Sequence, residues 1–282
     1  MKYRLLALTV TVVAVFCCVF GFTACGDTEE QQPATEGLEY EEIKEDGQAV
    51  GYAVAGLGKA EDTNIIIPST YNSKPVIAVS EMAFRFCTMQ TSITVPKSVK
   101  TIGLLAFEGC IHLKSITLPF VGDGSGKTNF GCIFGARDYD ENSRYIPDSL
   151  EEVIITGGNK IDAYAFNGCG GSLSSIKLPD SITTIGDGAF TSCSGLFDMK
   201  IPDKVTKIGD EVFKFCGNMQ SITIPGKITS FGSLSLGFCG RLTDINFSGT
   251  KAQWNEIHKA KNWNYLTTDY IVHCTDGDIA KV

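Results

Sequence analysis

A 23-residue pattern of apolar and polar positions recurs three times in succession between residues 174 and 242. Each unit opens with a short alternating segment that ends at a proline, and closes with a cysteine. The prolines and the cysteines keep the same spacing: Pro179, Pro202 and Pro225, then Cys193, Cys216 and Cys239. Alternation predicts a short strand with one face inward, and the proline ends that strand. A fixed period of about 20 to 50 residues indicates a solenoid.

The second half of each unit predicts a further short strand and a tight turn. Ile182 and Ile185 start the extended piece, and Gly186 makes the bend. A short helical turn then begins at Phe190, whose ring fills the interior of the coil. The phenylalanine and the cysteine recur at fixed positions: Phe84, Phe107, Phe166, Phe190 and Phe213, with Cys87, Cys110, Cys169, Cys193, Cys216 and Cys239. We expect about seven or eight coils with parallel strands in register.

The six cysteines in register allow two interpretations. In an exported protein they could form a ladder of disulfides. Alternatively, they are small buried side chains at a turn that is too tight for leucine. We favour the second interpretation, because one position repeated in every coil reflects a packing requirement. The chain has no Cys-x-x-Cys pair and no histidine-rich cluster, so we predict no metal site.

Different segments flank the regular units, which cover residues 64–250. Residues 38–63 predict a hairpin whose turn is Asp46-Gly47. Residues 251–282 lose the repeat pattern. We expect both segments to cap the stack, because terminal coils otherwise expose core and strand edges.

The C-terminal segment predicts two elements. A helix over residues 252–260 would turn Trp254 and Ile257 inward. An edge strand would follow at residues 270–274.

One region interrupts the period, between about residues 120 and 147. Cys110 and Cys169 are 59 residues apart, which is two units and 13 further residues. Insertions in a solenoid form loops on one face, often the face that binds. Because arginine and aromatic side chains dominate protein interfaces, we predict that Arg137, Tyr139 and Tyr145 contact a protein ligand. The alternative is that the aromatic side chains of this region pack the irregular coil.

The first 24 residues predict an export signal, because two basic residues precede twenty without charge. The segment Phe22-Thr23-Ala24-Cys25 resembles the lipobox of bacterial lipoproteins. That resemblance implies lipidation of Cys25 and attachment to a membrane through the N-terminal lipid. The alternative is an uncleaved transmembrane anchor, since about 20 apolar residues can span a bilayer. Residues 25–37 are polar and acidic and predict a disordered tether.

Charge narrows the class of partner. Without the leader, 22 basic and 32 acidic residues leave a net charge of −10. Nucleic-acid surfaces need basic stripes, so we expect no nucleic-acid partner.

Two loops in the interruption begin like ligand-binding motifs and then depart from them. Residues 122–128 end in Gly-Lys-Thr like a phosphate-binding loop, but Val121 replaces its first glycine. Residues 138–142 begin like a calcium loop, but Ser143 and Ser149 replace its glycine and glutamate. We favour a solvated acidic loop over a loose calcium site. The three histidines, His112, His258 and His273, stand in no nucleophile motif; we predict no enzyme and no cofactor.

The units share the pattern SIxLPxSITxIGxxAFxxC, which resembles the BspA-type leucine-rich repeats of bacterial surface proteins. The resemblance covers roughly residues 64–250, with local departures such as Leu236 in place of the repeated phenylalanine. It implies an α/β fold, a right-handed β/α leucine-rich-repeat solenoid at the cell surface. For some members it implies adhesion to host or neighbouring-cell proteins. It transfers no ligand, since function lies on variable surface positions.

Three hypotheses for function follow. The first is a surface-anchored protein that binds an extracellular, host or neighbouring-cell protein. The second is a structural spacer of the envelope without a specific ligand, which predicts no exposed aromatic patch on the coil faces. The third is a surface hydrolase, which requires a concave pocket with paired titratable groups. The sequence carries no signal for an oligomeric state.

We expect the mature protein to begin at a lipid-modified Cys25. Mass spectrometry of the N-terminal peptide from the membrane fraction should give the mass of that peptide plus its acyl chains. A Cys25→Ser variant should lose the added mass. A membrane-bound chain that retains residues 1–24 would instead identify a transmembrane anchor.

Overall fold

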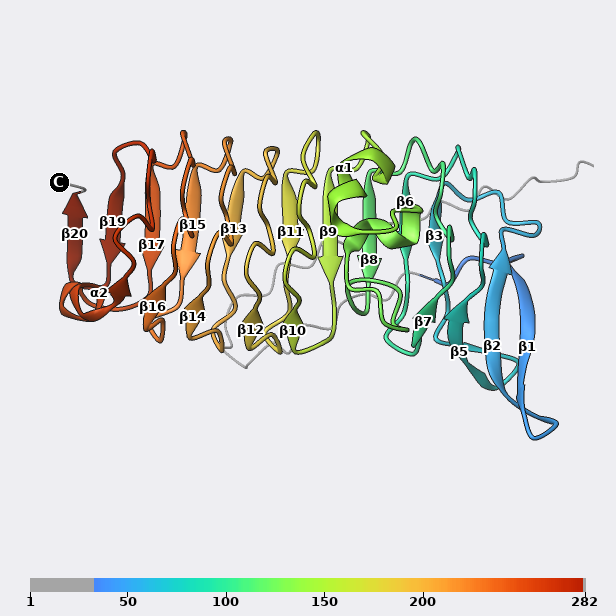
Figure 1. Cartoon of the computed structure of the whole chain (residues 1–282). Coiled ribbons are helices and arrows are strands. Elements are labelled where there is room, and N and C mark those ends of the chain that lie inside the picture. Colours follow the sequence, from blue (N-terminus) through green and yellow to red (C-terminus); the bar gives the residue numbers. More distant parts are fainter. Residues whose placement is uncertain (1–32, 281–282) are drawn as a thin grey trace, which may run out of the picture. The chain divides into compact units, whose positions relative to one another are not determined.

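A computed structural model describes residues 33–280, which form a solenoid of stacked coils (Figure 1). Its first wall is a column of nine parallel strands within those residues. They are β3 (Asn64–Ile66), β6 (Ser92–Thr94), β8 (Ser115–Leu118), β9 (Glu152–Ile155), β11 (Ser175–Lys177), β13 (Asp198–Lys200), β15 (Ser221–Ile224), β17 (Asp244–Phe247) and β19 (Ile271–Cys274). The predicted seven or eight coils are therefore too few.

The strands of the first column pair in register, so that one inward residue of each coil falls in a single row. Ile93 pairs with Ile116, and Ile222 pairs with Ile245. These four side chains are buried. The hydrogen-bonded ladder is divided once, between β11 and β13. The alternating segment before each proline thus produces the row, because every second side chain points inward.

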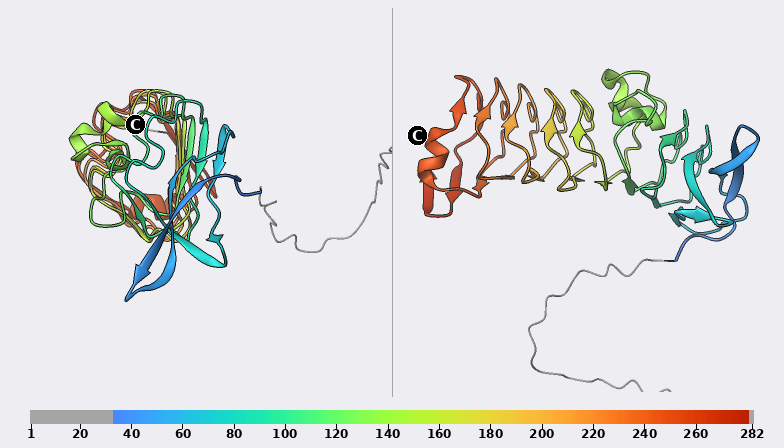
Figure 2. Two further views of the ribbon diagram at one scale, coloured as in Figure 1. Left: turned by 90° about the vertical axis from the view of Figure 1, so that its right-hand side faces the viewer. Right: turned by 90° about the horizontal axis from the view of Figure 1, so that it is seen from below.

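A second column of shorter strands forms another wall of the coil. It contains β5 (Lys74–Val79), β7 (Thr101–Ile102), β10 (Lys160–Ile161), β12 (Thr184–Ile185), β14 (Lys207–Ile208), β16 (Ser230–Phe231) and β18 (His258–Lys259). Viewed along the solenoid, the coils superpose on one another (Figure 2).

The third side of each coil is a pair of tight turns, and the short helix predicted there is wrong. In one coil, Glu211 and Phe215 have φ of 56° and 63°. Two left-handed residues so close together interrupt a right-handed helix. The N–H of Phe213 donates to the carbonyl oxygen of Ser235 at 2.9 Å, and that of Phe215 donates to Gly237 at 3.0 Å. These amides therefore bond to the next coil, whereas in a helix they would bond to carbonyl groups of the same helix.

The cysteine column is a row of hydrogen-bond donors. The Cys216 thiol donates to the carbonyl oxygen of Phe190 at 3.2 Å, and the thiol of Cys239 donates to that of Phe213 at 3.2 Å. In the last coil Thr267 takes the cysteine position and donates to Leu236 at 2.7 Å. All eight cysteines of residues 33–280 are free thiols, so they form no disulfide ladder. Burial raises the pKa of Cys239 to about 12.

The phenylalanine rings stack along the core. The centroids of Phe166 and Phe190 are 5.4 Å apart, and those of Phe190 and Phe213 are 5.3 Å apart with nearly parallel planes. Phe84 and Phe107 stack at 5.6 Å in the same way. All five rings are fully buried, which suits offset stacking of aromatic side chains.

The N-terminal hairpin extends the second column. It consists of β1 (Glu39–Glu45) and β2 (Gln48–Gly56), and β2 pairs in parallel with β5. The turn residues Asp46 and Gly47 both have positive φ, as a two-residue hairpin turn requires. A short strand, β4 (Thr70–Tyr71), pairs with β5. The outer strand β1 carries four glutamates, which oppose edge-to-edge pairing with another chain.

Residues 33–37 are ordered, although the sequence predicts a disordered tether up to residue 37. Thr35 is buried beside β3, the first strand of its column. Its N–H donates to Ile66 at 3.0 Å, and its hydroxyl oxygen accepts from the Ile66 N–H at 2.9 Å. It thereby satisfies a strand edge that has no preceding coil. The predicted leader, Cys25 and the rest of the tether lie outside the described residues.

The C-terminal segment completes further coils as well as capping them. A capping box of Thr250 and Gln253 starts α2 (Lys251–Glu256), which ends before the predicted residue 260 because the chain continues into β18. Strand β19 pairs with β17 on one side and with β20 (Gly277–Ala280) on the other. The edge strand is therefore β20, and β19 is the ninth strand of the column.

Aromatic side chains close the end of the core. Trp254 of α2 lies 5.3 Å from Phe247 and 6.1 Å from Trp263, between ring centroids. Ile257 is also buried. No helix in residues 33–280 is long and apolar enough to span a membrane.

His273 should make the C-terminal cap more stable at mildly acidic pH. Its Nε2 lies 2.8 Å from Asp244 of β17, and its Nδ1 lies 3.0 Å from Asp278 of β20. These hydrogen bonds, that with Asp244 first, raise the pKa of His273 above 6.5. A group whose pKa is raised by folding adds stability at pH values below its unfolded-state pKa. That stability is lost as the pH rises through the folded-state pKa. The melting temperature should fall between about pH 6 and pH 8.

A His273→Gln variant should show a smaller fall over the same range. His258→Gln, at an exposed position on β18, is the matched control and should behave like the wild type. Equal pH dependence in all three proteins would contradict the assignment.

Candidate functional site

The interrupted coil lies between β8 and β9. It contains η1 (Phe130–Phe134), η2 (Tyr139–Glu141) and α1 (Asn142–Tyr145). These short helices protrude from the side of the coils in both views of Figure 2. This coil is the predicted location of the ligand.

The Gly-Lys-Thr loop is closed on a carboxylate of its own. Asp123 Oδ1 accepts hydrogen bonds from the N–H groups of Ser125, Gly126 and Lys127 at 2.8, 3.0 and 3.0 Å. Burial alone would raise the pKa of Asp123, but these bonds and that of the Ser125 hydroxyl outweigh it and lower the pKa. A bound phosphate needs such N–H groups free. In this loop the Asp123 carboxylate already accepts their hydrogen bonds.

The predicted binding residues occupy different environments on the protruding helices. Arg137 is exposed, and its N–H donates to Glu141 at 2.9 Å. Tyr139 is half-buried and stacks on Tyr164 with 4.8 Å between ring centroids. Tyr145 is half-buried against the core. Their role in binding stays a prediction.

Two acidic side chains of residues 138–142, the segment that begins like a calcium loop, bond to the backbone. Asp138 caps η2 by accepting from the Tyr139 N–H at 2.6 Å, and Glu141 accepts from Arg137. Asn142, which would be the fifth residue of a calcium loop, points into the interior and is fully buried. The oxygens of this sequence therefore face different ways.

Two phenylalanines carry the aromatic stack through the interruption. Phe134 lies 6.1 Å from Phe107 of the preceding coil, and Phe130 lies 5.1 Å from Phe166 of the following one. The two rings are 5.4 Å apart. Both are fully buried, so they pack the irregular coil as the alternative interpretation expects.

Asn142 joins the interruption to the next coil. Its Oδ1 accepts from the Gly131 N–H at 2.9 Å and from Asn129 at 3.3 Å. Its Nδ2 donates to the carbonyl oxygens of Asn167 at 2.9 Å and Ala165 at 3.3 Å. One side chain therefore supplies bonds that backbone hydrogen bonds between successive turns supply in regular coils, such as that from Gly168 to Thr191.

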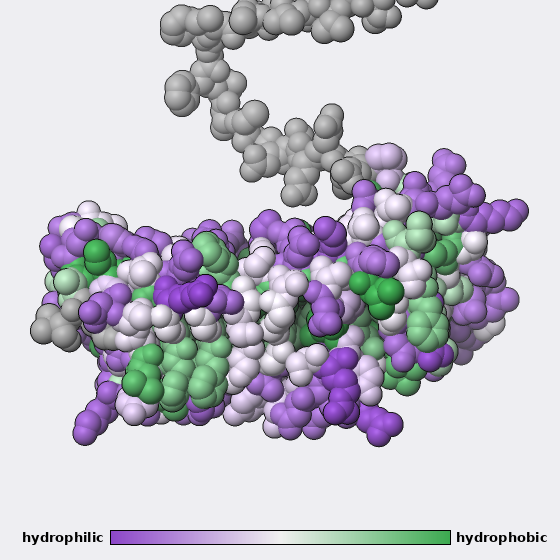
Figure 3. Space-filling model, turned by 90° about the horizontal axis from the view of Figure 1, so that it is seen from above, coloured by the Kyte–Doolittle hydropathy of each residue, from purple (hydrophilic) through white to green (hydrophobic). Residues whose placement is uncertain are grey.

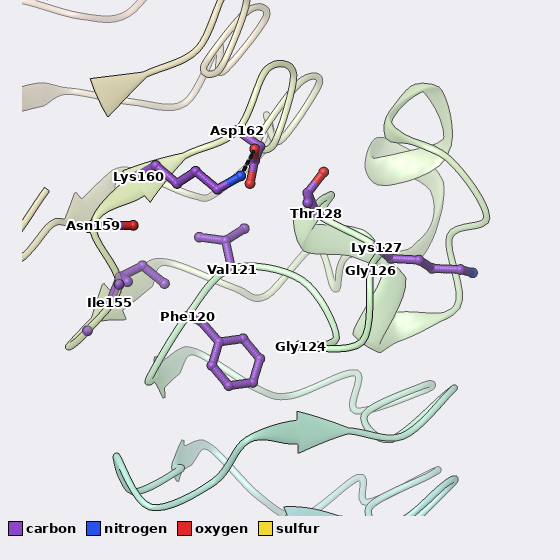
Figure 4. A pocket seen from close by; sticks show the side chains of 12 residues that line it. Phe120, Val121, Gly124, Gly126, Lys127, Thr128, Ile155, Asn159, Lys160 and Asp162 are labelled. Atoms are coloured by element: carbon purple, nitrogen blue, oxygen red, sulfur yellow. Dashed lines mark hydrogen bonds and ion pairs between the residues drawn. The ribbon is translucent and has the colours of Figure 1, made fainter. Parts of the chain in front are cut away.

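A cleft of about 280 Å³ separates the interruption from the coil that follows. The loop 120–128 forms one side and residues 155–162 form the other (Figure 4). Phe120, Val121 and Ile155 supply apolar surface. Lys160 pairs with Asp162 at 2.7 Å, whereas the side chain of Lys127 points away from the cleft (Figure 4).

A second surface, which sequence reasoning missed, lies on the turns of the last coils. We call Phe215, Phe238, Tyr265 and Leu266 the turn-edge patch. Its centroid distances are 4.5 Å from Phe215 to Phe238 and 5.6 Å from Phe238 to Tyr265. Tyr265 is 53% and Leu266 is 63% exposed. Figure 3 shows hydrophobic surface gathered over these C-terminal coils, at the end that Figure 1 draws on the left.

The backbone under the patch is left-handed. Phe215, Phe238 and Leu266 have φ of 63°, 61° and 53°. Glycine fills the equivalent position in two other coils, at Gly109 and Gly168. A bulky residue in this conformation costs about 1 kcal/mol or more. The signal in the sequence is a phenylalanine directly before the cysteine in two successive units, where the three units before them have glycine or serine.

Comparison with known protein families identifies the type of the repeats. A family model described as BspA type Leucine rich repeat region matches in six copies over residues 60–132 and 145–260. No curated protein matches the chain.

Solved structures similar to this chain include three bacterial proteins. A leucine-rich repeat protein of T. pallidum is 23% identical over 77% of this chain and 86% of its own, with a TM-score of 0.38. One from Bacteroides ovatus is 22% identical over 82% and 67%, with a TM-score of 0.45. The pneumococcal vaccine antigen PcpA is 16% identical over 72% and 66%, with a TM-score of 0.34.

Removing the Asn142 side chain should destabilise the solenoid. Asn142→Ala leaves the buried Gly131 N–H without an acceptor, and a buried unpaired polar group costs about 1–3 kcal/mol. With the cavity added, we expect a loss of at least about 2 kcal/mol, measured by denaturant unfolding. Asn218→Ala, at an exposed position in a regular turn, should stay within about 0.5 kcal/mol of wild type. Equal stability of the two variants would contradict the role of Asn142.

Proposed function

The chain belongs to the BspA-type leucine-rich repeat family, and we propose that it is an exported binding protein that contacts another protein at the cell surface. The leader and the lipobox-like Cys25 support export and attachment through a lipid. The solenoid is the scaffold, because its repeated side chains are used for stacking and cannot also recognise a ligand. The ligand is an extracellular protein of a host or a neighbouring cell.

The turn-edge patch is the observation that carries this proposal. Aromatic side chains are the usual anchors of protein interfaces. The amides beneath them are fixed, since the Phe238 N–H donates to the Tyr265 carbonyl oxygen at 2.8 Å. An exposed phenylalanine at a left-handed position, where Gly109 and Gly168 stand in other coils, opposes folding stability, and this supports a functional role for the side chain. Lys214, which pairs with Glu211 at 2.8 Å, lies 5.3 Å from the Phe215 ring centroid.

The alternative functions are less well supported. A spacer without a ligand predicts coil faces without an exposed aromatic patch. A hydrolase requires paired titratable groups in a pocket. The cleft lining holds one carboxylate, Asp162, and it is neutralised by Lys160. Arg137, Tyr139 and Tyr145 remain a second proposed contact region on the same scaffold.

Replacing patch residues with glycine should remove binding without removing the fold. Phe215→Gly with Phe238→Gly restores the residue that the turn uses at Gly109, so strain is relieved while stacking is lost. We expect stability within about 1 kcal/mol of wild type. Binding of this variant to immobilised extracellular-matrix and bacterial surface extracts should be at least tenfold weaker than that of the wild type.

Phe86→Gly is the matched control. Phe86 has the same place in its turn, a φ of 57° and 61% exposure, but it lies in the first coil. Its replacement should leave capture unchanged. Full capture by the patch variant would overturn the assignment of the patch.

A further inference from the structure

One step of the second strand column is open. At the steps where the strands pair, an N–H of the later coil donates to a carbonyl of the earlier one. Gly103 donates to Val79 at 2.8 Å, Gly186 to Ile161 at 2.9 Å, and Gly232 to Ile208 at 2.8 Å. These bonds tie β7, β12 and β16 to the coil that precedes each of them.

Strand β10 lacks these bonds on the side that faces the interruption. Lys160 pairs with Thr184, so Asn159 and Asp162 are equivalent to Thr183 and Gly186. Thr183 donates to Asn159 at 2.8 Å, yet the N–H groups of Asn159 and Asp162 themselves meet no acceptor within residues 33–280. The Ile161 carbonyl faces β12. Because successive residues of a strand direct their backbone groups to opposite sides, the Lys160 carbonyl faces the interruption.

Space as well as unpaired groups is needed for a ligand, and the cleft beside β10 provides it. The loop 120–128 diverges from β10, and the cleft lies between them (Figure 4). The step from β12 to β14 is also without ladder bonds, but it is filled. There, a Cβ on Gly209 would lie 2.1 Å from Asp187 Oδ1. The β10 step is thus both unpaired and open.

We propose that this cleft binds a short extended peptide segment, which adds a strand between the interruption and β10. The Asn159 N–H, the Lys160 carbonyl and the Asp162 N–H form the donor, acceptor and donor array that a parallel or antiparallel strand satisfies. One peptide side chain lies on the apolar surface of Phe120, Val121 and Ile155. This site is separate from the turn-edge patch and does not depend on it.

The charges of the cleft favour a neutral backbone over an anion. Lys160 is paired with Asp162, and the Gly126 and Lys127 amides are held by Asp123. The one remaining cation of the lining, Lys127, points away (Figure 4). The segment recognised is therefore uncharged where it enters the cleft, with an apolar residue at its centre.

The test uses a phage-displayed library of random heptapeptides, selected on the full chain and depleted on a Thr128→Trp variant. Thr128 is exposed and lines the cleft, so tryptophan there fills it without altering β10. We expect enrichment of uncharged peptides with a central apolar residue. A synthetic copy with N-methylated amides should bind at least tenfold more weakly, because it cannot pair as a strand.

Amide exchange of the unmodified chain gives an independent readout. By NMR, the Asn159 and Asp162 amides should exchange fast in the free protein and at least tenfold more slowly with bound peptide. The Phe215→Gly, Phe238→Gly protein should bind the peptide normally, which separates this site from the patch. No enrichment, equal binding of the N-methylated peptide, or protection of both amides in the free protein would each overturn the proposal.

Discussion

The backbone bond from one coil to the next is the constraint on which this protein depends. Every wall uses it: strands pair in register in two columns, and the turns donate outward, as Phe213 does to Ser235. A buried N–H without a partner is costly, so each coil must place its amides opposite the carbonyls of its neighbour. That requirement fixes the unit length at 23 residues in the regular part. It also explains the left-handed residues, which turn the amides along the solenoid axis.

The interruption shows how a solenoid tolerates a coil of another length. The first column continues without a gap, because Ile116 pairs with Val153 across the insertion. On the turn side, two phenylalanines replace one, and Asn142 makes four hydrogen bonds that join the interruption to the turns of the next coil. Only the second column is left open, beside β10. Core packing and the bonds between turns are thus maintained across the interruption, whereas the backbone groups of β10 on that side stay unpaired.

The sequence predicts the parts of this fold that repeat. The 23-residue spacing locates the stacked phenylalanines, the cysteine column and the strands before each proline. It does not predict the turn geometry, because a left-handed φ at Glu211 or Phe215 arises from bonds to the next coil and not from local preference. For the same reason Thr267 is not recognised as the equivalent of cysteine: it follows an irregular coil, and only its bond to Leu236 identifies it. The residues of the turn-edge patch differ from those at the same positions of other units, so the shared repeat pattern does not predict them.

The thiol column has a consequence for where this protein can fold. Each thiol of the cysteine column that donates to a carbonyl oxygen, such as Cys110, contributes to stability in its reduced form. Burial raises the pKa of Cys110 to about 12. Thiolate, the form that exchanges and oxidises, is therefore scarce at neutral pH. Secreted proteins commonly rely on disulfides and so on an oxidising compartment. Residues 33–280 contain no disulfide, so this solenoid needs no oxidant or isomerase to reach its covalent structure.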